Sequence, residues 1–404
     1  MPLLNKVRTA APGGHGSHTA APTLSRLRSA LTVFFALDGF LFAGWVVRIP
    51  AIKQQTGASA GELGLALLGV SAGAVVTMVF TGRLCRRFGS HPVTVACGAL
   101  MALAIALPPQ THSALALGLV LLVFGAAYGG VNVAMNSAAV DLVAALRRPV
   151  MPSFHAAFSL GGMVGAGVGA LVAGNLSATS HLLALTGFGL VVTVLAGRVL
   201  LRHPAPVPAS TSQARGRRLD GRARRLVLLF GAIALCTAYG EGAMADWGAL
   251  HLEQDLAAAP GIAAVGYSLF ALAMTAGRLS GTALLERLGQ TRTLVAGGLT
   301  ACAGMLLGAL APQIWLALAG FAVMGLGLAN IFPVAVARAG SLAGPGGVAA
   351  ASTLGYGGML LGPPAIGLIA EWASLPVALT TVAALAAGAA LIGYTARHAT
   401  ATEA

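Results

Sequence analysis

The sequence predicts an all-helical integral membrane protein that crosses the bilayer twelve times, as two pseudo-symmetric bundles of six helices. First, 57% of the residues are hydrophobic, only 9% are charged, and the mean hydropathy is +0.84, a composition that excludes an ordinary soluble domain. Second, the 404 residues divide into apolar runs of about 20 residues, the length that spans a bilayer. Third, short motifs recur at a nearly constant offset, which indicates an internal duplication.

Residues 1–28 contain no apolar run, so we expect a flexible N-terminal tail. The first span is predicted at 29–51 and is too long to be the core of a cleaved signal peptide. It carries Asp38 about 3 Å from its centre, at 1.5 Å rise per residue. Because a carboxylate at that depth is costly, we expect Asp38 to face water, a partner or a substrate. A hydrogen-bonded packing role between helices is the alternative.

The remaining apolar runs place eleven further spans. They are predicted at 61–82, 92–108, 114–136, 151–174, 181–202, 226–250, 261–285, 292–311, 313–337, 347–370 and 374–396. A connection at 203–225, rich in Pro, Ser and Arg, separates an N-terminal bundle, 29–202, from a C-terminal bundle, 226–397, which a short tail, 398–404, follows. We expect this connection to be a solvated cytoplasmic linker, with lipid head-group contact as the alternative.

The basic residues indicate the orientation. The net charge is +13, but the basic residues are spread over the connections without interleaved aromatic residues, so we expect no nucleic-acid partner. Nearly all fall on the side of the N-terminus: Lys6, Arg8, Arg26, Arg28, Arg83, Arg86, Arg87, Arg147, Arg148, the connection 198–225, Arg287, Arg292, Arg338 and Arg397. The opposite side carries little more than Lys53, Glu253 and Asp255. The positive-inside rule therefore predicts a multi-pass protein of the plasma membrane with both termini cytoplasmic.

The two predicted bundles repeat each other. Gly44-Trp45 matches Asp246-Trp247 at an offset of 202, Arg87-Phe88-Gly89 matches Arg287-Leu288-Gly289 at 200, Gly125 matches Gly325 at 200, and Gly161-Gly162-Met163 matches Gly357-Gly358-Met359 at 196. With an even number of spans in each unit the copies run parallel, and such repeats bind a solute near the midplane between them. A small-molecule solute is therefore the expected ligand.

The connection after the second span, Gly82 to Gly89 (GRLCRRFG), resembles the G-x-L-a-D-R-x-G loop of the major facilitator superfamily. The resemblance covers essentially the whole chain after the tail, although Arg86 stands where that family has an acid. It implies the major facilitator fold, alternating access, and a cytoplasmic gate at this loop and its second copy, to which we assign Arg87, Glu286 and Arg287. Positive-inside anchoring of the arginines is the alternative.

Two further segments resemble the fucose-permease-like branch of that superfamily: FFALDGFLFAGWVVRIPAIK, which begins at Phe34, and SFHAAFSLGG, which begins at Ser153. In that branch an acid in the first span is associated with proton-coupled sugar uptake. The resemblance therefore implies symport of a proton with a small polar solute, for which a sugar is one candidate. A proton-driven efflux antiporter is the alternative function, although the fifth span lacks the G-P element of drug antiporters.

Glu241 lies beside the position of Asp38 under the offset of 202, so each half presents one carboxylate near mid-depth. We assign Asp38 and Glu241 to proton coupling or substrate binding, with interhelical hydrogen bonding as the alternative. Arg48 and Asp246, nearer the outer ends of the first and seventh spans, are predicted to attract each other when the outer mouth closes. The alternative is that Arg48 reaches the membrane interface while Asp246 is solvated.

Tyr128, Asn132 and Asn136 recur at every fourth residue of the fourth span, a polar stripe that is predicted to line the cavity. Asn330 in the tenth span and His155 in the fifth are further cavity candidates, and His155 is also a candidate proton shuttle. Helix–helix hydrogen bonding by the asparagines and packing of His155 near a helix end are the alternatives.

The remaining residues indicate neither an enzyme nor a cofactor. Glycines at 161, 165 and 169 predict close packing between spans of one chain, and we expect the protein to act as a monomer. The four cysteines, Cys85, Cys97, Cys236 and Cys302, are scattered and are expected to be free thiols without a metal. No convergent His, Asp or Ser constellation suggests catalysis, so a membrane-embedded enzyme or a solute sensor is the less favoured reading, and the expected coupling ion is H⁺.

Overall fold

The computed structural model describes residues 21–58, 60–173, 175–206, 221–258 and 260–397, and within these ranges the regular structure is helical. The elements in chain order are α1 (Ala21–Val46), α2 (Ile49–Thr56), α3 (Ala60–Phe88), α4 (Ser90–Ala104), η1 (Pro108–Gln110), α5 (Ala114–Leu146), α6 (Met151–Val172), α7 (Ala178–Arg202), α8 (Gly221–Gln254), α9 (Pro260–Leu310), α10 (Ile314–Leu328), α11 (Ile331–Ala343), α12 (Pro345–Trp372) and α13 (Leu375–Thr395).

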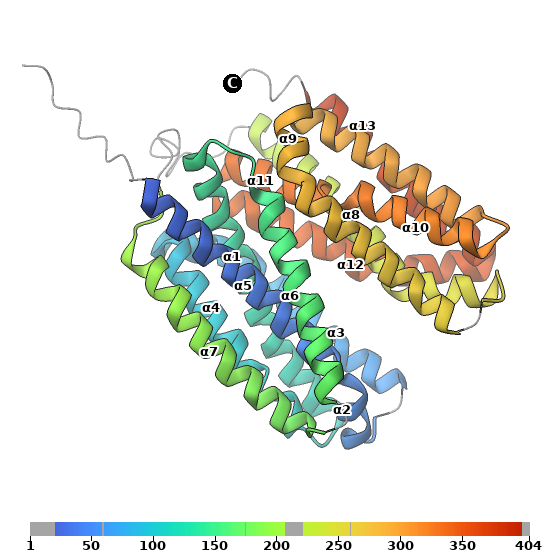
Figure 1. Cartoon of the computed structure of the whole chain (residues 1–404), viewed down its shortest axis with the longest axis horizontal. Helices are drawn as coiled ribbons and strands as arrows, with labels where there is room; N and C mark the ends of the chain where they lie inside the picture. Colours follow the sequence, from blue (N-terminus) through green and yellow to red (C-terminus); the bar gives the residue numbers. More distant parts are fainter. Residues whose placement is uncertain (1–20, 59, 174, 207–220, 259, 398–404) are drawn as a thin grey trace, which may run out of the picture.

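These helices form two halves of six crossings each, as predicted (Figure 1). The N-terminal half contains α1, α3, α4, α5, α6 and α7, and the C-terminal half contains α8, α9, α10 with α11, α12 and α13. Ten stretches of the described chain are long and apolar enough to cross a membrane, and one of them, Val265–Leu310, has 46 residues. A straight helix of that length would measure about 70 Å, more than twice the hydrocarbon thickness. It therefore crosses twice, with a turn at Gly289.

Gly289 makes this turn through a backbone conformation, φ 77° and ψ 169°, that only glycine adopts without strain. Replacing it by alanine is expected to lower the free energy of unfolding by about 1–3 kcal/mol. The thermal unfolding midpoint of the purified protein measures this. Gly388→Ala is the matched control, because Gly388 lies inside α13 and a Cβ there would meet nothing within 4 Å. A Gly289→Ala midpoint at or above that of the parent would contradict the assignment.

The first helix differs from the predicted span at both ends. It begins at Ala21 instead of residue 29, because Leu27 is buried in the core and continues the helix below the expected start. It ends at Val46, and the short α2 follows with Pro50 in its first turn, where proline is tolerated. Residues 21–28 of the predicted tail therefore belong to α1, and residues 1–20 lie outside the described ranges. Likewise α8 begins at Gly221, inside the predicted linker, of which 207–220 lie outside the described residues.

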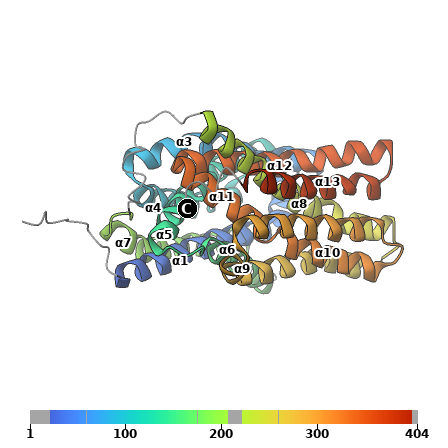
Figure 2. The ribbon, with the colours of Figure 1, turned by 90° about the horizontal axis from the view of Figure 1, so that it is seen from above.

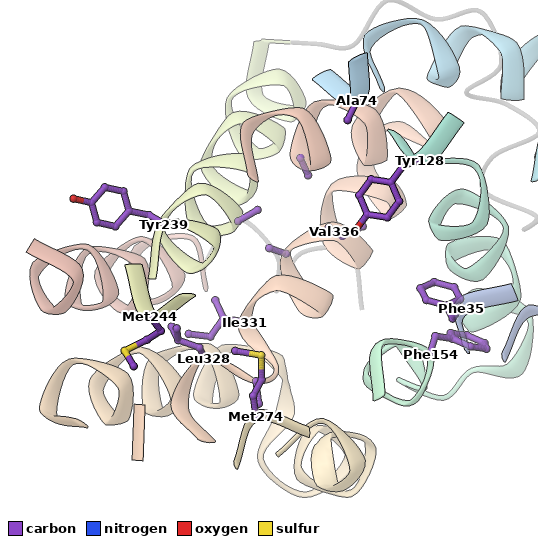
Figure 3. Close-up of a cluster of buried hydrophobic side chains, with 14 of the residues drawn as sticks. Phe35, Ala74, Tyr128, Phe154, Tyr239, Met244, Met274, Leu328, Ile331 and Val336 are labelled. Atoms are coloured by element: carbon purple, nitrogen blue, oxygen red, sulfur yellow. The ribbon is translucent and has the colours of Figure 1, made fainter. Parts of the chain in front are cut away.

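Close backbone contact joins α1 to α6. A Cβ at Gly161 or Gly165 would collide with the carbonyl oxygen of Ala36 or Phe40 on α1. Next to this contact the rings of Phe35 and Phe154 stack with centroids 5.3 Å apart, within the large buried cluster of Figure 3. The prediction that these glycines pack spans of the same chain is confirmed.

Both described chain ends, near Ala21 and Thr395, lie at one end of the molecule, here called the terminal end; the opposite end is the distal end (Figures 1 and 2). The two halves meet toward the terminal end, where a Cβ at Gly82 of α3 would lie 2.8 Å from the Pro345 oxygen at the start of α12. The ribbons of the halves separate toward the distal end (Figure 1). The contact between the halves is therefore concentrated at the terminal end.

Candidate functional site

Asp38 on α1 lies inside the N-terminal half, where it is only 2% exposed. It lines a small cavity of about 10 Å³ together with Phe34, Leu37, Leu41, Gly98, Met101 and Val131. Neither carboxyl oxygen has a hydrogen-bond partner. This differs from the expectation that Asp38 faces water, a partner or a substrate, because apolar side chains of α1, α4 and α5 enclose it. An ionised carboxylate in such a site would be very unfavourable, so the geometry fits the neutral, protonated form.

Aromatic rings lie between Asp38 and the other half. Tyr128 on α5 stacks on Phe42 with centroids 4.8 Å apart, and its ring meets the edge of Tyr356 on α12 at 5.9 Å. This ring contact joins the two halves. Both rings are also close enough to Asp38 and Glu241 to interact with them electrostatically. The predicted cavity residue Tyr128 thus lies at the contact between the halves.

The other members of the polar stripe on α5 are more deeply buried than predicted. Asn132 is 8% exposed and Asn136 is fully buried. The Asn136 amide nitrogen donates to the backbone oxygen of Asn132 at 2.8 Å, which satisfies it within the helix. The side-chain oxygens of both residues have no hydrogen-bond partner. In this conformation the stripe is a buried polar track inside the bundle, and its role in lining the cavity stays a prediction.

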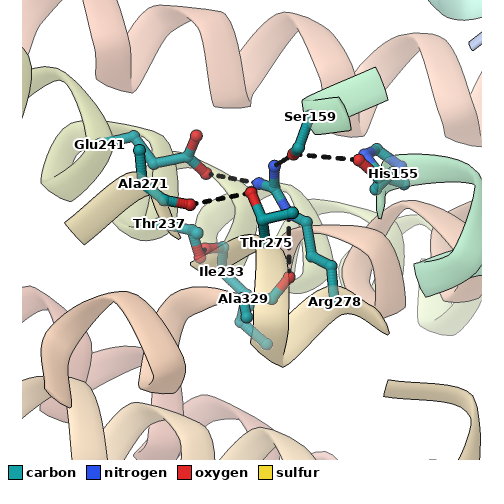
Figure 4. A network of polar contacts seen from close by, with 9 residues as sticks. All are labelled: His155, Ser159, Ile233, Thr237, Glu241, Ala271, Thr275, Arg278 and Ala329. Atoms are coloured by element: carbon teal, nitrogen blue, oxygen red, sulfur yellow. Dashed lines mark hydrogen bonds and ion pairs between the residues drawn. The ribbon is translucent and has the colours of Figure 1, made fainter. Parts of the chain in front are cut away.

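Arg278 on α9 is a buried cation between the halves that the sequence reading missed. Pro333 on α11 cannot donate to the carbonyl four residues earlier, which frees the oxygen of Ala329. Arg278 Nε donates to this oxygen at 3.3 Å. Its Nη2 donates to Glu241 Oε1 at 3.3 Å and its Nη1 to Ser159 Oγ at 2.7 Å. Figure 4 shows Ser159 of α6 and Glu241 of α8 approaching the guanidinium from the two halves.

Glu241 is more accessible than its partner, since 31% of its side chain is exposed against 7% of the Arg278 side chain. Tyr267 on α9 lies close enough to interact electrostatically with Glu241, Arg278 and Asp246. Asp246 itself is exposed, farther along α8 toward the distal end. These groups give the C-terminal half an accessible acidic surface with a buried arginine behind it.

His155 and Asn330, two predicted cavity residues, adjoin this network. The His155 ring packs edge-on against Phe35 of its own half at 5.5 Å and against Phe332 of the other half at 5.8 Å. The Asn330 amide donates to the Gly277 oxygen at 2.9 Å, next to Arg278 on α9. This hydrogen bond joins the break between α10 and α11 to α9. It corresponds to helix–helix hydrogen bonding, the alternative role given above for Asn330.

Arg48 is 3% exposed and binds within its own half. Its Nε donates to His181 Nδ1 at 2.8 Å, and its terminal nitrogens donate to the oxygens of Val172 and Ala173 at 3.3 Å. It thus adds a donor to carbonyl groups at the C-terminal end of α6, where the Val172 oxygen also accepts from the backbone N–H groups of Asn175 and Leu176. The predicted pairing of Arg48 with Asp246 concerns a closed distal end and is not formed in this conformation.

At the terminal end an ion pair joins the two halves. Arg148, between α5 and α6, approaches Glu286 Oε1 with its Nη2 at 2.8 Å and its Nε at 2.9 Å. The hydrogen bond and the charge of Glu286 raise the pKa of Arg148. Glu286 is thus placed at a contact between the halves, although its partner Arg148 was not predicted. Arg87 and Arg287, also assigned to the gate, are exposed at the same end, where Arg87 lies over the ring of Phe88.

Arg278 could have been predicted as a functional residue, because it is a charged residue within an apolar run, as Asp38 is. The roles of Arg148, Ser159 and His181 could not be predicted from the sequence, because each depends on a partner more than a hundred residues away. Among the described residues, His, Cys, Asp and Glu side chains form no group of three or more that would hold a metal ion. The cysteines are free thiols, as predicted.

Comparison with known proteins identifies the family. The model of the Major Facilitator Superfamily matches residues 29–244. An uncharacterised MFS-type transporter of Yersinia pestis is 34% identical over 373 residues, 90% of this chain and 94% of that protein. The membrane protein MosC of Rhizobium meliloti is 30% identical over 361 residues, 88% of this chain and 87% of that protein.

Solved structures agree on the fold. FucP in its outward conformation superposes with a TM-score of 0.74 at 16% identity, covering 94% of this chain and 99% of FucP. The proton:xylose symporter XylE superposes with a TM-score of 0.74 at 12% identity, covering 93% and 96%. At these identities the likeness concerns the fold alone. Together with the sequence relatives, it means that this chain belongs to the major facilitator superfamily and is a multi-pass membrane transporter.

Proposed function

We propose that the protein is a proton-coupled symporter that moves a small polar solute by alternating access. The observation that carries the proposal is the Asp38 carboxyl, buried without a hydrogen-bond partner in an apolar site of a transporter fold. A carboxyl group in these surroundings is stable when neutral, and its charged form needs water or a cation. It is therefore suited to bind a proton in one conformation and release it in another.

The surroundings of Asp38 favour a proton over a metal cation. The other side chains that line its cavity are Phe34, Leu37, Leu41, Met101 and Val131, with Gly98, so among the described residues they supply no second oxygen ligand. Hard cations take several oxygen ligands. The cavity, about 10 Å³, holds at most one water. A proton needs only the carboxyl group itself.

We further propose that both termini are cytoplasmic. The terminal end carries Arg83, Arg86, Arg87, Arg147, Arg148, Arg287, Arg292, Arg338 and Arg397, which supports this orientation through the positive-inside rule. The terminal end, where the halves meet, is then the cytoplasmic side. The conformation described here would accept solute from outside.

For the solute, support comes from the residues and from the structural neighbours. Glu241, Tyr267 and Asp246 offer hydrogen-bond acceptors and a hydroxyl on the accessible surface of the C-terminal half. FucP is described as a fucose:proton symporter and XylE as a proton:xylose symporter. A sugar is therefore the first solute to test. An efflux antiporter for a cationic compound is the alternative, because the same two carboxylates would neutralise a cation.

The test is the internal pH of proteoliposomes that contain the purified protein and receive a panel of sugars and lipophilic cations. We expect a polar solute to acidify the lumen when it enters together with protons. Empty liposomes are the control, and the same solute should not acidify their lumen. Alkalinisation by a lipophilic cation would favour the antiporter. A response to Na⁺ in place of H⁺ would contradict the assignment of the coupling ion.

A further inference from the structure

The guanidinium of Arg278 links the accessible carboxylate of one half to a hydroxyl of the other half. It reaches three oxygens with three different nitrogens: Nε to Ala329, Nη2 to Glu241 and Nη1 to Ser159. Since the guanidinium is planar and rigid, fixing Nε and Nη2 also fixes the direction of Nη1. The shortest of the three bonds, 2.7 Å to Ser159, is the one that crosses between the halves.

The charge of Glu241 decides whether this arrangement is stable. Ala329 and Ser159 offer neutral oxygens, so among the residues bound to Arg278 only Glu241 compensates its charge. Protonation of Glu241 would leave a cation that is 7% exposed without a counter-ion. Breaking a buried ion pair in this way is strongly unfavourable, and hydration of the guanidinium relieves it. Water reaches Arg278 from the terminal side only if the halves part there.

We propose that Arg278 is a positioning residue that converts the charge of Glu241 into closure of the terminal end. Ionised Glu241 holds the guanidinium against Ser159 and keeps the halves together, whereas protonated Glu241 weakens that contact. The inference rests on the proposed proton coupling and deepens it by giving the direction. A proton bound from the distal side favours opening of the terminal side, which gives the proton an inward direction.

Other titratable groups lie near Glu241 and Arg278, and the test must distinguish their titration from that of Glu241. Tyr128 on α5, Tyr356 on α12 and Tyr267 on α9 interact electrostatically with Glu241, and Asp246 is its neighbour on α8. His155 on α6 lies beside Arg278 (Figure 4). Asp38 on α1 interacts electrostatically with Tyr128 and Tyr356. Because the tyrosines stay neutral at ordinary pH, His155, Asp38 and Asp246 are the groups whose titration must be separated from that of Glu241.

The experiment measures the distance between the distal ends of the halves without solute. Spin labels are placed at Gln54 on α2 and Gln254 on α8, both exposed, in a protein whose four native cysteines are replaced by alanine. Dipolar spectroscopy in lipid nanodiscs then gives the ratio of distally open to distally closed molecules. The pH is varied from about 4 to about 8, a range over which carboxyl groups in proteins titrate.

In the parent we expect the distally open fraction to fall as the pH falls. Glu241→Gln is expected to lower the open-to-closed ratio by about tenfold at neutral pH, as for loss of a hydrogen bond to a charged group, and to flatten its pH dependence. Ser159→Ala should lower the ratio similarly, and combining it with Glu241→Gln should add little, since both act on one contact. Arg278→Lys keeps the charge but loses the planar fork, so it should also lose the pH response.

Glu371→Gln is the matched control, because it removes an exposed carboxylate of α12 at the distal end and should leave the ratio unchanged. A Glu241→Gln protein with the ratio and pH dependence of the parent would overturn the inference. So would a Ser159→Ala protein that behaves as the parent. Asp246→Asn and His155→Gln should each retain the pH response; if either abolishes it, that group rather than Glu241 controls closure. Distances that respond as expected without solute-driven proton flux would refute the symport proposal and leave the role of Arg278 intact.

Discussion

Asp38→Asn is expected to abolish solute-driven proton uptake in proteoliposomes while the protein stays folded. Asparagine resembles the neutral carboxyl group in size and polarity but cannot release a proton. Since both oxygens of Asp38 lie unpaired in an apolar site, the native conformation already requires the neutral form. The thermal unfolding midpoint should therefore not fall, and luminal acidification should drop to the level of empty liposomes.

A second measurement on the same variant distinguishes loss of coupling from loss of binding. Exchange of labelled for unlabelled solute needs only the loaded carrier, so it should continue in Asp38→Asn. Glu371→Gln is the matched control, since Glu371 is an exposed carboxylate at the distal end of α12 and should not be needed for proton uptake. Unchanged proton flux in Asp38→Asn would refute its role and leave Glu241 as the coupling carboxylate. Loss of exchange together with flux would indicate that Asp38 is needed for binding.

Arg48→Met is expected to produce a marked loss of stability. The substitution keeps a similar volume but leaves the buried His181 Nδ1 without its donor and removes one donor from the oxygens of Val172 and Ala173. Leaving the buried ring nitrogen unpaired is expected to lower the free energy of unfolding by about 1–3 kcal/mol. The unfolding midpoint in detergent should fall by about 2–4 °C. Arg287→Met, at an exposed arginine, is the control and should change little.

This prediction also bears on the proposed latch between Arg48 and Asp246. For Arg48 to reach Asp246, it must give up its bonds to His181 and to the end of α6. A stable Arg48→Met protein would mean that these bonds contribute little, so that Arg48 is available for the latch. A strongly destabilised one would favour a structural role at the end of α6.

The sequence predicted the architecture well because hydropathy and duplication are properties of the chain itself. Twelve apolar runs and the repeated motif, Arg87-Phe88-Gly89 and Arg287-Leu288-Gly289, were enough to predict two six-helix halves. The glycines that end the two motifs both have positive φ. Helix ends were less predictable. The first span breaks before Pro50, which lies in the first turn of α2, and at the other end the buried Leu27 extends the helix.

The candidate site was predictable only in part. Intramembrane charge marked Asp38 and Glu241, and the same rule applied to Arg278 would have marked it as well. Which oxygens Arg278 reaches depends on the break before Pro333 and on the approach of α6, which follow from packing between distant helices. The polar stripe of α5 is predicted to line the cavity, yet Asn136 is fully buried. A helical period identifies the polar face of a helix, but it does not say which neighbouring helix covers that face.

The position of the contact between the halves has an electrical consequence. Glu241 is 31% exposed, and the ion pair of Arg148 with Glu286 closes the opposite, terminal end. With the termini in the cytoplasm, as proposed, the membrane potential falls mainly across the closed layer between these two places. A charge that crosses the whole potential gains about 2.3 kcal/mol per 100 mV. A proton passed inward from Glu241 crosses this layer, so transport should be electrogenic and should respond to voltage even without a pH gradient.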